Sequence, residues 1–104
     1  MDRSQLAMTF TDVVGFICKR PKMYTMNGTF AEVIAFIDGY TSADSVKKSR
    51  MEWHGFSSWL AKRLEYSDAI VAAEYLRERY PSDDEAIDEL AQRYAEYALT
   101  KDQT

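Results

Sequence analysis

Apolar residues recur at steps of three and four positions along most of the chain, and this spacing constrains the fold more than any other feature of the sequence. A repeat near 3.6 residues places apolar side chains on one face of a helix, whereas a strand needs a repeat of two. Thr29 and Glu32 form a capping-box pattern before the clearest run. The sequence therefore predicts a helix from residue 29 to residue 40, and we expect it to be the central, most buried one. Its apolar residues are Phe30, Val33, Ile34, Ile37 and Tyr40.

Four further segments show the same helical spacing. The first is capped at Thr11-Asp12 and ends before Pro21, since proline disfavours helical backbone in the residue before it. A second carries Trp53, Phe56, Trp59, Leu60 and Leu64. A third is capped by Ser67 or Asp68 and ends at Pro81, and the last begins with a capping box of Ser82 and Glu85.

The segments between these helices carry turn or loop signals. Residues 22–28 are predicted to form a connection that ends in the turn dipeptide Asn27-Gly28. A short strand over 23–26 would lack a pairing partner elsewhere in the chain. Residues 41–50 are polar and aperiodic, which favours a solvated loop.

Together these patterns predict an all-α fold, a single compact bundle of about five helices over residues 1–104, with frayed ends at 1–8 and 100–104. An apolar fraction of 46% is enough to form a core. The single Cys18 excludes an internal disulfide and is expected to be a small buried hydrophobic residue.

Signals for a membrane, a cofactor or a metal are missing from the sequence. No apolar stretch approaches the ~20 residues that a membrane span needs, and no secretory leader is evident. We therefore expect a cytoplasmic protein. One His and one Cys do not suffice for a Cys/His zinc site, so we expect neither a metal nor a cofactor.

Histidine 54 is the one side chain with an ordinary pKa near neutrality. No nucleophile, base and orienting group stand in a recognisable pattern around it. We therefore expect that the protein is not an enzyme. A small enzyme built around His54 is the less favoured hypothesis.

The formal charge of −4 hides an uneven distribution along the chain. Residues 1–64 hold nine Lys/Arg and six Asp/Glu, a net +3, whereas residues 65–104 hold four and eleven, a net −7. Acids in the first turn of a helix are favoured by the helix dipole, which explains part of the excess. The more specific interpretation of the acidic excess is a surface that binds a basic partner. Tyrosines beyond those needed for the core would add contact area to this surface. The candidate partner-binding residues are Asp83, Asp84, Glu85, Asp88, Glu89 and Tyr97.

The segment Arg20-Pro21-Lys22-Met23-Tyr24 has the pattern R-P-x-M-Y, and further matching residues follow it. This set resembles a group of small uncharacterised bacterial proteins that look like immunity proteins, which neutralise a cognate toxin. The resemblance implies a toxin domain as partner. The motif also makes sense as a fold signature, in which Tyr24 packs back onto the bundle and Arg20 donates to a carboxylate. The other matching residues are Gly28, Phe36, Gly39, Tyr40, Phe56, Trp59, Leu60, Tyr80 and Pro81.

The leading functional hypothesis is thus a protein-binding module, an immunity protein that acts through an acidic, tyrosine-bearing surface. The alternative is a nucleic-acid-associated or transcriptional regulatory protein. Nucleic acid is the less expected partner, because the chain is acidic overall. A homodimer through the last helix is also left open. The nucleic-acid alternative would use Lys47, Lys48, Arg50, Lys62 and Arg63.

Overall fold

A computed structural model of the protein describes residues 9–43, 48–65 and 71–102, with side chains up to Thr100. These residues form six helices and no strand, which confirms the all-α prediction. Five of the helices match the five predicted ones, and the sixth is a single turn. They are α1 (Phe10–Lys19), α2 (Pro21–Tyr24), α3 (Phe30–Ala43), α4 (Lys48–Arg63), α5 (Ala72–Arg79) and α6 (Asp83–Asp102).

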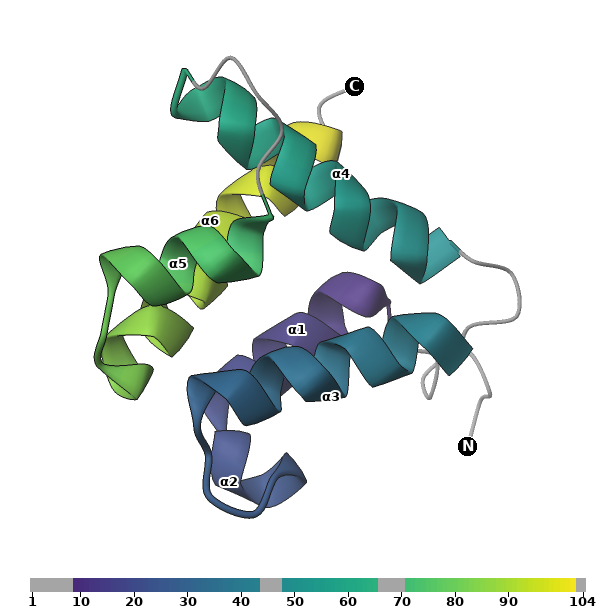
Figure 1. Ribbon diagram of the computed structural model, residues 1–104. Helices are drawn as coiled ribbons and strands as arrows, with labels where there is room; N and C mark the ends of the chain where they lie inside the picture. The colour runs from purple at the N-terminus through teal and green to yellow at the C-terminus, as the bar shows by residue number, and fades with distance from the viewer. Residues whose placement is uncertain (1–8, 44–47, 66–70, 103–104) are drawn as a thin grey trace, which may run out of the picture.

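The last helix, α6, is the centre of the fold. It runs behind α5 and α4 in Figure 1 and contacts α1, α3, α4 and α5. Its inner face is a regular stripe of buried residues at steps of three and four. The expectation that α3 is the central helix is therefore wrong, because α3 is the shorter helix and exposes Ala35 and Gly39 on its outer side. The stripe on α6 consists of Ala86, Ile87, Leu90, Tyr94 and Tyr97.

Aromatic rings fill the part of the core where α6 meets α1 and α4. The Tyr94 ring lies 5.1 Å from the Phe56 ring and 5.8 Å from the Phe10 ring, measured between centroids. Trp53 stacks on Phe56 at 5.8 Å. Aromatic pairs at such distances contribute about 0.5–1.5 kcal/mol each beyond the area that they bury. These contacts join three helices that lie far apart in the sequence.

The first helix begins two residues earlier than predicted. Thr9 is its N-cap, and the Asp12 N–H donates to the Thr9 hydroxyl at 3.1 Å while the Asp12 carboxylate accepts the Thr9 N–H at 3.2 Å. Thr9 has the extended backbone of an N-cap residue, whereas Thr11 is already helical. The predicted capping box of α3 is confirmed, since Thr29 and Glu32 exchange the same pair of bonds.

The prediction of a solvated loop over residues 41–50 is wrong at both of its ends. Helix α3 continues to Ala43 and α4 begins at Lys48, while residues 44–47 lie outside the described part. Thr41 and Ser49 are buried. The Thr41 hydroxyl donates to the Asp38 carbonyl at 3.0 Å, so a polar residue satisfies its hydrogen bonding inside the helix.

The C-terminal end also differs from expectation, because α6 runs to Asp102 and residues 100–102 are helical rather than frayed. The Thr100 hydroxyl donates to the Glu96 carbonyl at 3.0 Å. The expected fraying at 1–8 and 103–104 and the expected cap at Ser67 or Asp68 lie outside the described residues. Within the described ranges, no helix combines the length and the apolar character that crossing a membrane requires.

Candidate functional site

The six candidate partner-binding residues fall into three groups with different surroundings: two acids with arginine partners, three exposed acids and one buried tyrosine. Asp83 belongs to a structural joint. Its carboxylate oxygen accepts from the Arg77 guanidinium at 2.7 Å and from the Phe30 backbone N–H at 3.2 Å. The hydrogen bond from Arg77, followed by that from Phe30, lowers the pKa of Asp83 below its ordinary value. Asp83 therefore ties the start of α6 to the end of α5 and to the start of α3.

Glu89 is likewise engaged within the fold. Its carboxylate accepts from the Arg93 guanidinium at 2.7 Å, and only 16% of its side chain is exposed. Arg93 also pairs with Glu96 at 3.2 Å, and Glu96 pairs with Arg63 of α4 at 3.3 Å. Glu89 is thus the least exposed carboxylate in a chain of ion pairs that joins α6 to α4.

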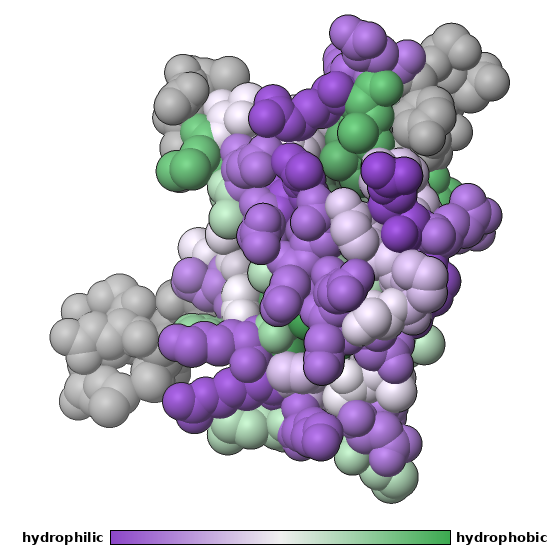
Figure 2. Space-filling view, turned by 90° about the vertical axis from the view of Figure 1, so that its left-hand side faces the viewer, coloured by the Kyte–Doolittle hydropathy of each residue, from purple (hydrophilic) through white to green (hydrophobic). Residues whose placement is uncertain are grey.

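Three carboxylates remain exposed on the first two turns of α6. Asp84, Glu85 and Asp88 form no ion pair among the residues that the structure describes. Asp84 and Glu85 lie in the first turn, where the helix dipole favours acids, and Asp88 lies a turn further along. Figure 2 shows the side of the molecule that carries α5 and the start of α6, and hydrophilic side chains cover most of it. We call Asp84, Glu85 and Asp88 the acidic face.

The expectation that Tyr97 is a surface residue is wrong, because it is 9% exposed. Its ring lies 5.8 Å from both Phe56 and Trp59, so it completes the aromatic core between α6 and α4. A β-carbon on Gly55 would collide with the Tyr97 hydroxyl, and glycine at position 55 leaves room for it. The face of α6 that carries Tyr94 and Tyr97 is therefore used inside the bundle and is not available to a second copy of the chain.

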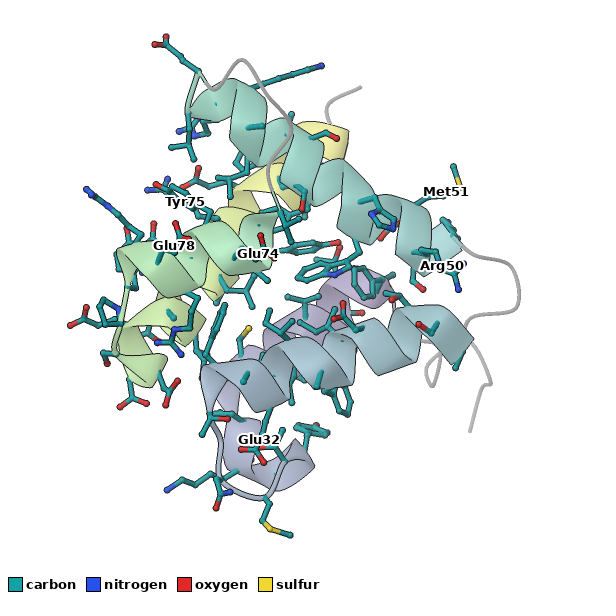
Figure 3. The ribbon with its side chains drawn as sticks, in the orientation of Figure 1. Glu32, Arg50, Met51, Glu74, Tyr75 and Glu78 are labelled. Carbon is teal, nitrogen blue, oxygen red and sulfur yellow. The ribbon has the colours of Figure 1, made fainter. Side chains whose placement is uncertain are left out.

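A surface groove that the sequence did not reveal lies between α3 and α5. Its volume is about 390 Å³, and its apolar part comprises Phe30, Ala31, Ile34 and Ala73. Its polar part comes from one helix, α5, as Glu74, Arg77 and Glu78. Figure 3 shows Glu74 and Glu78 one turn apart along α5. The i,i+4 spacing of these two acids was the signal in the sequence, but it does not indicate which helix lies opposite.

A second, more polar pocket of about 300 Å³ contains His54. Two polar groups in this pocket have structural hydrogen bonds: the Ser57 hydroxyl accepts from the Ala72 N–H at 3.1 Å, and the Asp38 carboxylate accepts from the Trp53 indole at 3.1 Å. Ser57 thereby supports the start of α5. His54 itself is exposed and lies in the second turn of α4.

Cys18 is buried, as expected, on the inner face of α1. Burial, reinforced by the negative charge of Asp88, raises the pKa of the Cys18 thiol to about 12. A thiol with so high a pKa is a poor nucleophile at neutral pH. The interpretation of Cys18 as a core residue therefore fits its surroundings.

The R-P-x-M-Y segment forms α2 and the turns beside it. Pro21 is the first residue of this single turn, and the Tyr24 ring lies 5.7 Å from the Phe36 ring of α3. The expected packing of Tyr24 onto the bundle is thus confirmed. The expected bond from Arg20 to a carboxylate is wrong, because its guanidinium lies 3.8 Å from the Met23 sulfur. Among the described residues, the arginines of other helices that pair with carboxylates of α6 are Arg63 and Arg77.

The basic residues of the nucleic-acid alternative are dispersed along α4. Lys48 and Lys62 are exposed, Arg63 pairs with Glu96 and covers the Trp59 ring, and Arg50 lies beside the Ser42 carbonyl. Lys47 lies outside the described residues.

No three His, Cys, Asp or Glu side chains gather as a metal site within residues 9–43, 48–65 and 71–100. Comparison with known proteins adds no further assignment to these surfaces. No family model, curated protein or solved structure matches the chain.

Proposed function

We propose that the protein is a small protein-binding module, an immunity protein that neutralises a cognate bacterial toxin through the acidic face. The observation that carries this proposal is the difference between the acids of α6. Asp83 and Glu89 have arginine partners, whereas Asp84, Glu85 and Asp88 project from the surface without one in the described structure.

Exposed like charges on a single helix face repel one another, so they do not stabilise the fold by their mutual contacts. Such a cluster does raise the rate at which a basic partner is encountered, and it disfavours acidic partners. The partner that fits is a protein with a basic surface. The resemblance of the R-P-x-M-Y segment to immunity proteins supports a toxin domain as that partner.

The direct test is co-expression in a bacterial host with a candidate toxin domain, chosen from the products of the genes that neighbour the gene for this chain. We expect host growth to stop when the toxin domain is expressed alone and to resume when this chain is present. The two proteins should also copurify as a complex. Continued growth arrest together with no complex would contradict the proposal.

A matched variant separates binding from catalysis in the same assay. His54→Ala removes the one imidazole from the polar pocket and leaves the acidic face unchanged. We expect this variant to protect the host as well as the wild-type chain does. Loss of protection by a folded His54→Ala variant would favour the enzyme hypothesis instead.

A further inference from the structure

The groove between α3 and α5 combines an apolar floor with an acidic margin. Ala31, Ile34 and Ala73 give the floor small or aliphatic side chains, while Phe30 lies at the end nearest to α6. Phe30 is buried there beneath the Arg77 guanidinium, which lies 5.3 Å from the ring centroid. A floor of small side chains allows another backbone to approach closely.

The charges around this groove are unequal. Arg77 is neutralised by Asp83 at 2.7 Å, so it does not offset other acids of the groove. Glu74 and Glu78 are exposed, and within residues 9–43, 48–65 and 71–100 neither has an ion-pair partner. The groove therefore has two uncompensated negative charges on its α5 side.

We infer that this groove binds an amphipathic basic segment of the partner protein, and this inference deepens the function proposed above and rests on it. The apolar side chains of the segment would cover Ala31, Ile34 and Ala73. Its Lys or Arg side chains would lie beside Glu74 and Glu78. An amphipathic helix in an apolar groove is a common mode of peptide recognition. The charges at the margin of the groove select the sign of the charge on the bound helix and the direction in which it lies.

A second copy of this chain fits the same groove poorly. A symmetric contact places the same surface patch on both subunits, so the two α5 helices would bring Glu74 and Glu78 of each copy together. The whole chain also has a net charge of −4. A basic segment from a different protein has the complementary charge and meets neither penalty.

The experiment measures binding of two fluorescent 18-residue amphipathic helical peptides to the full chain. Both peptides carry leucine on one face, and they differ only in having lysine or glutamate on the other. We expect saturable binding of the lysine peptide, at least tenfold tighter than that of the glutamate peptide at low salt. Backbone amide chemical shifts should change chiefly in α3 and α5. The absence of saturable binding, or shifts confined to other helices, would overturn the inference.

Two double variants with the same net charge distinguish peptide binding in the groove from general attraction to an acidic protein. Glu74→Lys with Glu78→Lys, and Asp84→Lys with Asp88→Lys, each replace two exposed acids of the described surface by lysines. We expect the first pair to weaken lysine-peptide binding about tenfold and the second pair less than threefold. Equal weakening by both pairs would show attraction to the overall charge and would overturn the inference.

The apolar contribution is tested with Ala31→Gln, which places a long polar side chain on the floor of the groove without adding a charge. We expect binding to weaken at least fivefold, with the melting temperature unchanged. Binding as tight as that of the wild type would contradict the inference. Sedimentation tests whether a second copy of the chain occupies the groove instead. A concentration-dependent dimer that Ala31→Gln abolishes would assign the groove to that second copy.

The groove and the proposed function can fail separately. If the chain binds the lysine peptide in the groove but does not protect the host, the groove assignment is retained and the toxin as partner is rejected. If the chain protects the host but its groove variants bind the lysine peptide normally, the proposed function is retained and the groove assignment is rejected.

Discussion

At the scale of single residues, the close contact between Gly55 and Tyr97 determines how α4 packs on α6. The Tyr97 hydroxyl occupies the space that a β-carbon at position 55 would need. Phe56, the next residue, packs against the ring of the same tyrosine. A substitution at position 55 therefore acts on the aromatic core rather than on the surface.

Gly55→Ala is expected to lower the free energy of unfolding by about 1–3 kcal/mol, the usual cost of an added methyl group in a packed core. Chemical denaturation followed by tryptophan fluorescence measures the change. Gly15→Ala is the matched control, since nothing lies within 4 Å of its β-carbon position. The control should leave stability unchanged or raise it by about 1 kcal/mol, as alanine does inside a helix.

Adding Tyr97→Phe to Gly55→Ala should recover part of the lost stability, because the colliding hydroxyl is then gone. The double-mutant cycle isolates this coupling from other contacts of Tyr97. A coupling of zero would mean that the two residues do not press on each other.

The Tyr94 hydroxyl is a second consequence of the crowded core. It is buried and makes no hydrogen bond of ordinary length and angle in the described structure, where the Thr11 side chain interacts with it only weakly. Burial raises the pKa of Tyr94 above its ordinary range. We expect Tyr94→Phe to raise the free energy of unfolding by about 1 kcal/mol, since an unsatisfied buried polar group destabilises the folded state. Thermal unfolding of the two proteins measures this, and a clear fall in the melting temperature would contradict it.

At the scale of elements, Asp83 joins three helices through one carboxylate. It starts α6, accepts the Phe30 N–H at the start of α3, and pairs with Arg77 of α5. The Arg77 guanidinium also donates to the carbonyls of Tyr80 and Pro81 between α5 and α6. This joint fixes the angle between the helices and hence the end of the groove.

The lowered pKa of Asp83 makes this joint sensitive to acid. A carboxyl whose pKa is lower in the folded than in the unfolded chain stabilises the fold above the unfolded value, 3.8 for Asp. That contribution is lost as the pH falls through the folded value. Asp83→Asn should therefore unfold at a lower temperature at pH 7, and its melting temperature should fall less steeply below about pH 4.

Asp88→Asn is the control for this pH series, because Asp88 lies beyond the first turn of α6, is exposed and lacks an ion-pair partner in the described ranges. Its melting curve should follow that of the wild type across the same pH range. Identical acid limbs for Asp83→Asn and the wild type would contradict the assignment of Asp83 as a joint.

The helices themselves were predictable, but their neighbours were not. Spacing and caps identified α3 and α6 because those signals are local, within about four residues of each other. Burial of Tyr97 depends on Gly55, forty-two positions earlier, and the groove depends on α3 lying beside α5. Residues 41–43 and 48–50 were mistaken for loop because polar residues have weak helix signals, whereas Ser49 and Thr41 are buried by packing.

The same distinction applies to the candidate site. The charge split along the sequence correctly located the acids on the last helix, but it did not separate Asp83 and Glu89, which have arginine partners, from Asp84, Glu85 and Asp88. Arg77 lies six positions before Asp83 in a different helix, and only the chain reversal at Pro81 brings them together. Pairing across a turn of this kind has no simple spacing rule.

At the scale of the whole molecule, the proposed function depends on charge that the fold leaves uncompensated. Rim charges of this kind act mainly on the rate of association and only weakly on the rate of dissociation. Salt screens them, with a Debye length of about 10 Å at 0.1 M. The acidic face should therefore be visible in kinetics more clearly than in equilibrium affinity.

The most direct test is the association rate constant with a candidate toxin domain, chosen from the products of the neighbouring genes and measured from low to high salt. For the variant Asp84→Lys/Glu85→Lys/Asp88→Lys we predict association at least tenfold slower at low salt, with the difference vanishing at high salt. The neutral variant Asp84→Asn/Glu85→Gln/Asp88→Asn should lie between it and the wild type. Equal association rates for all three proteins at every salt concentration would contradict the role of the acidic face.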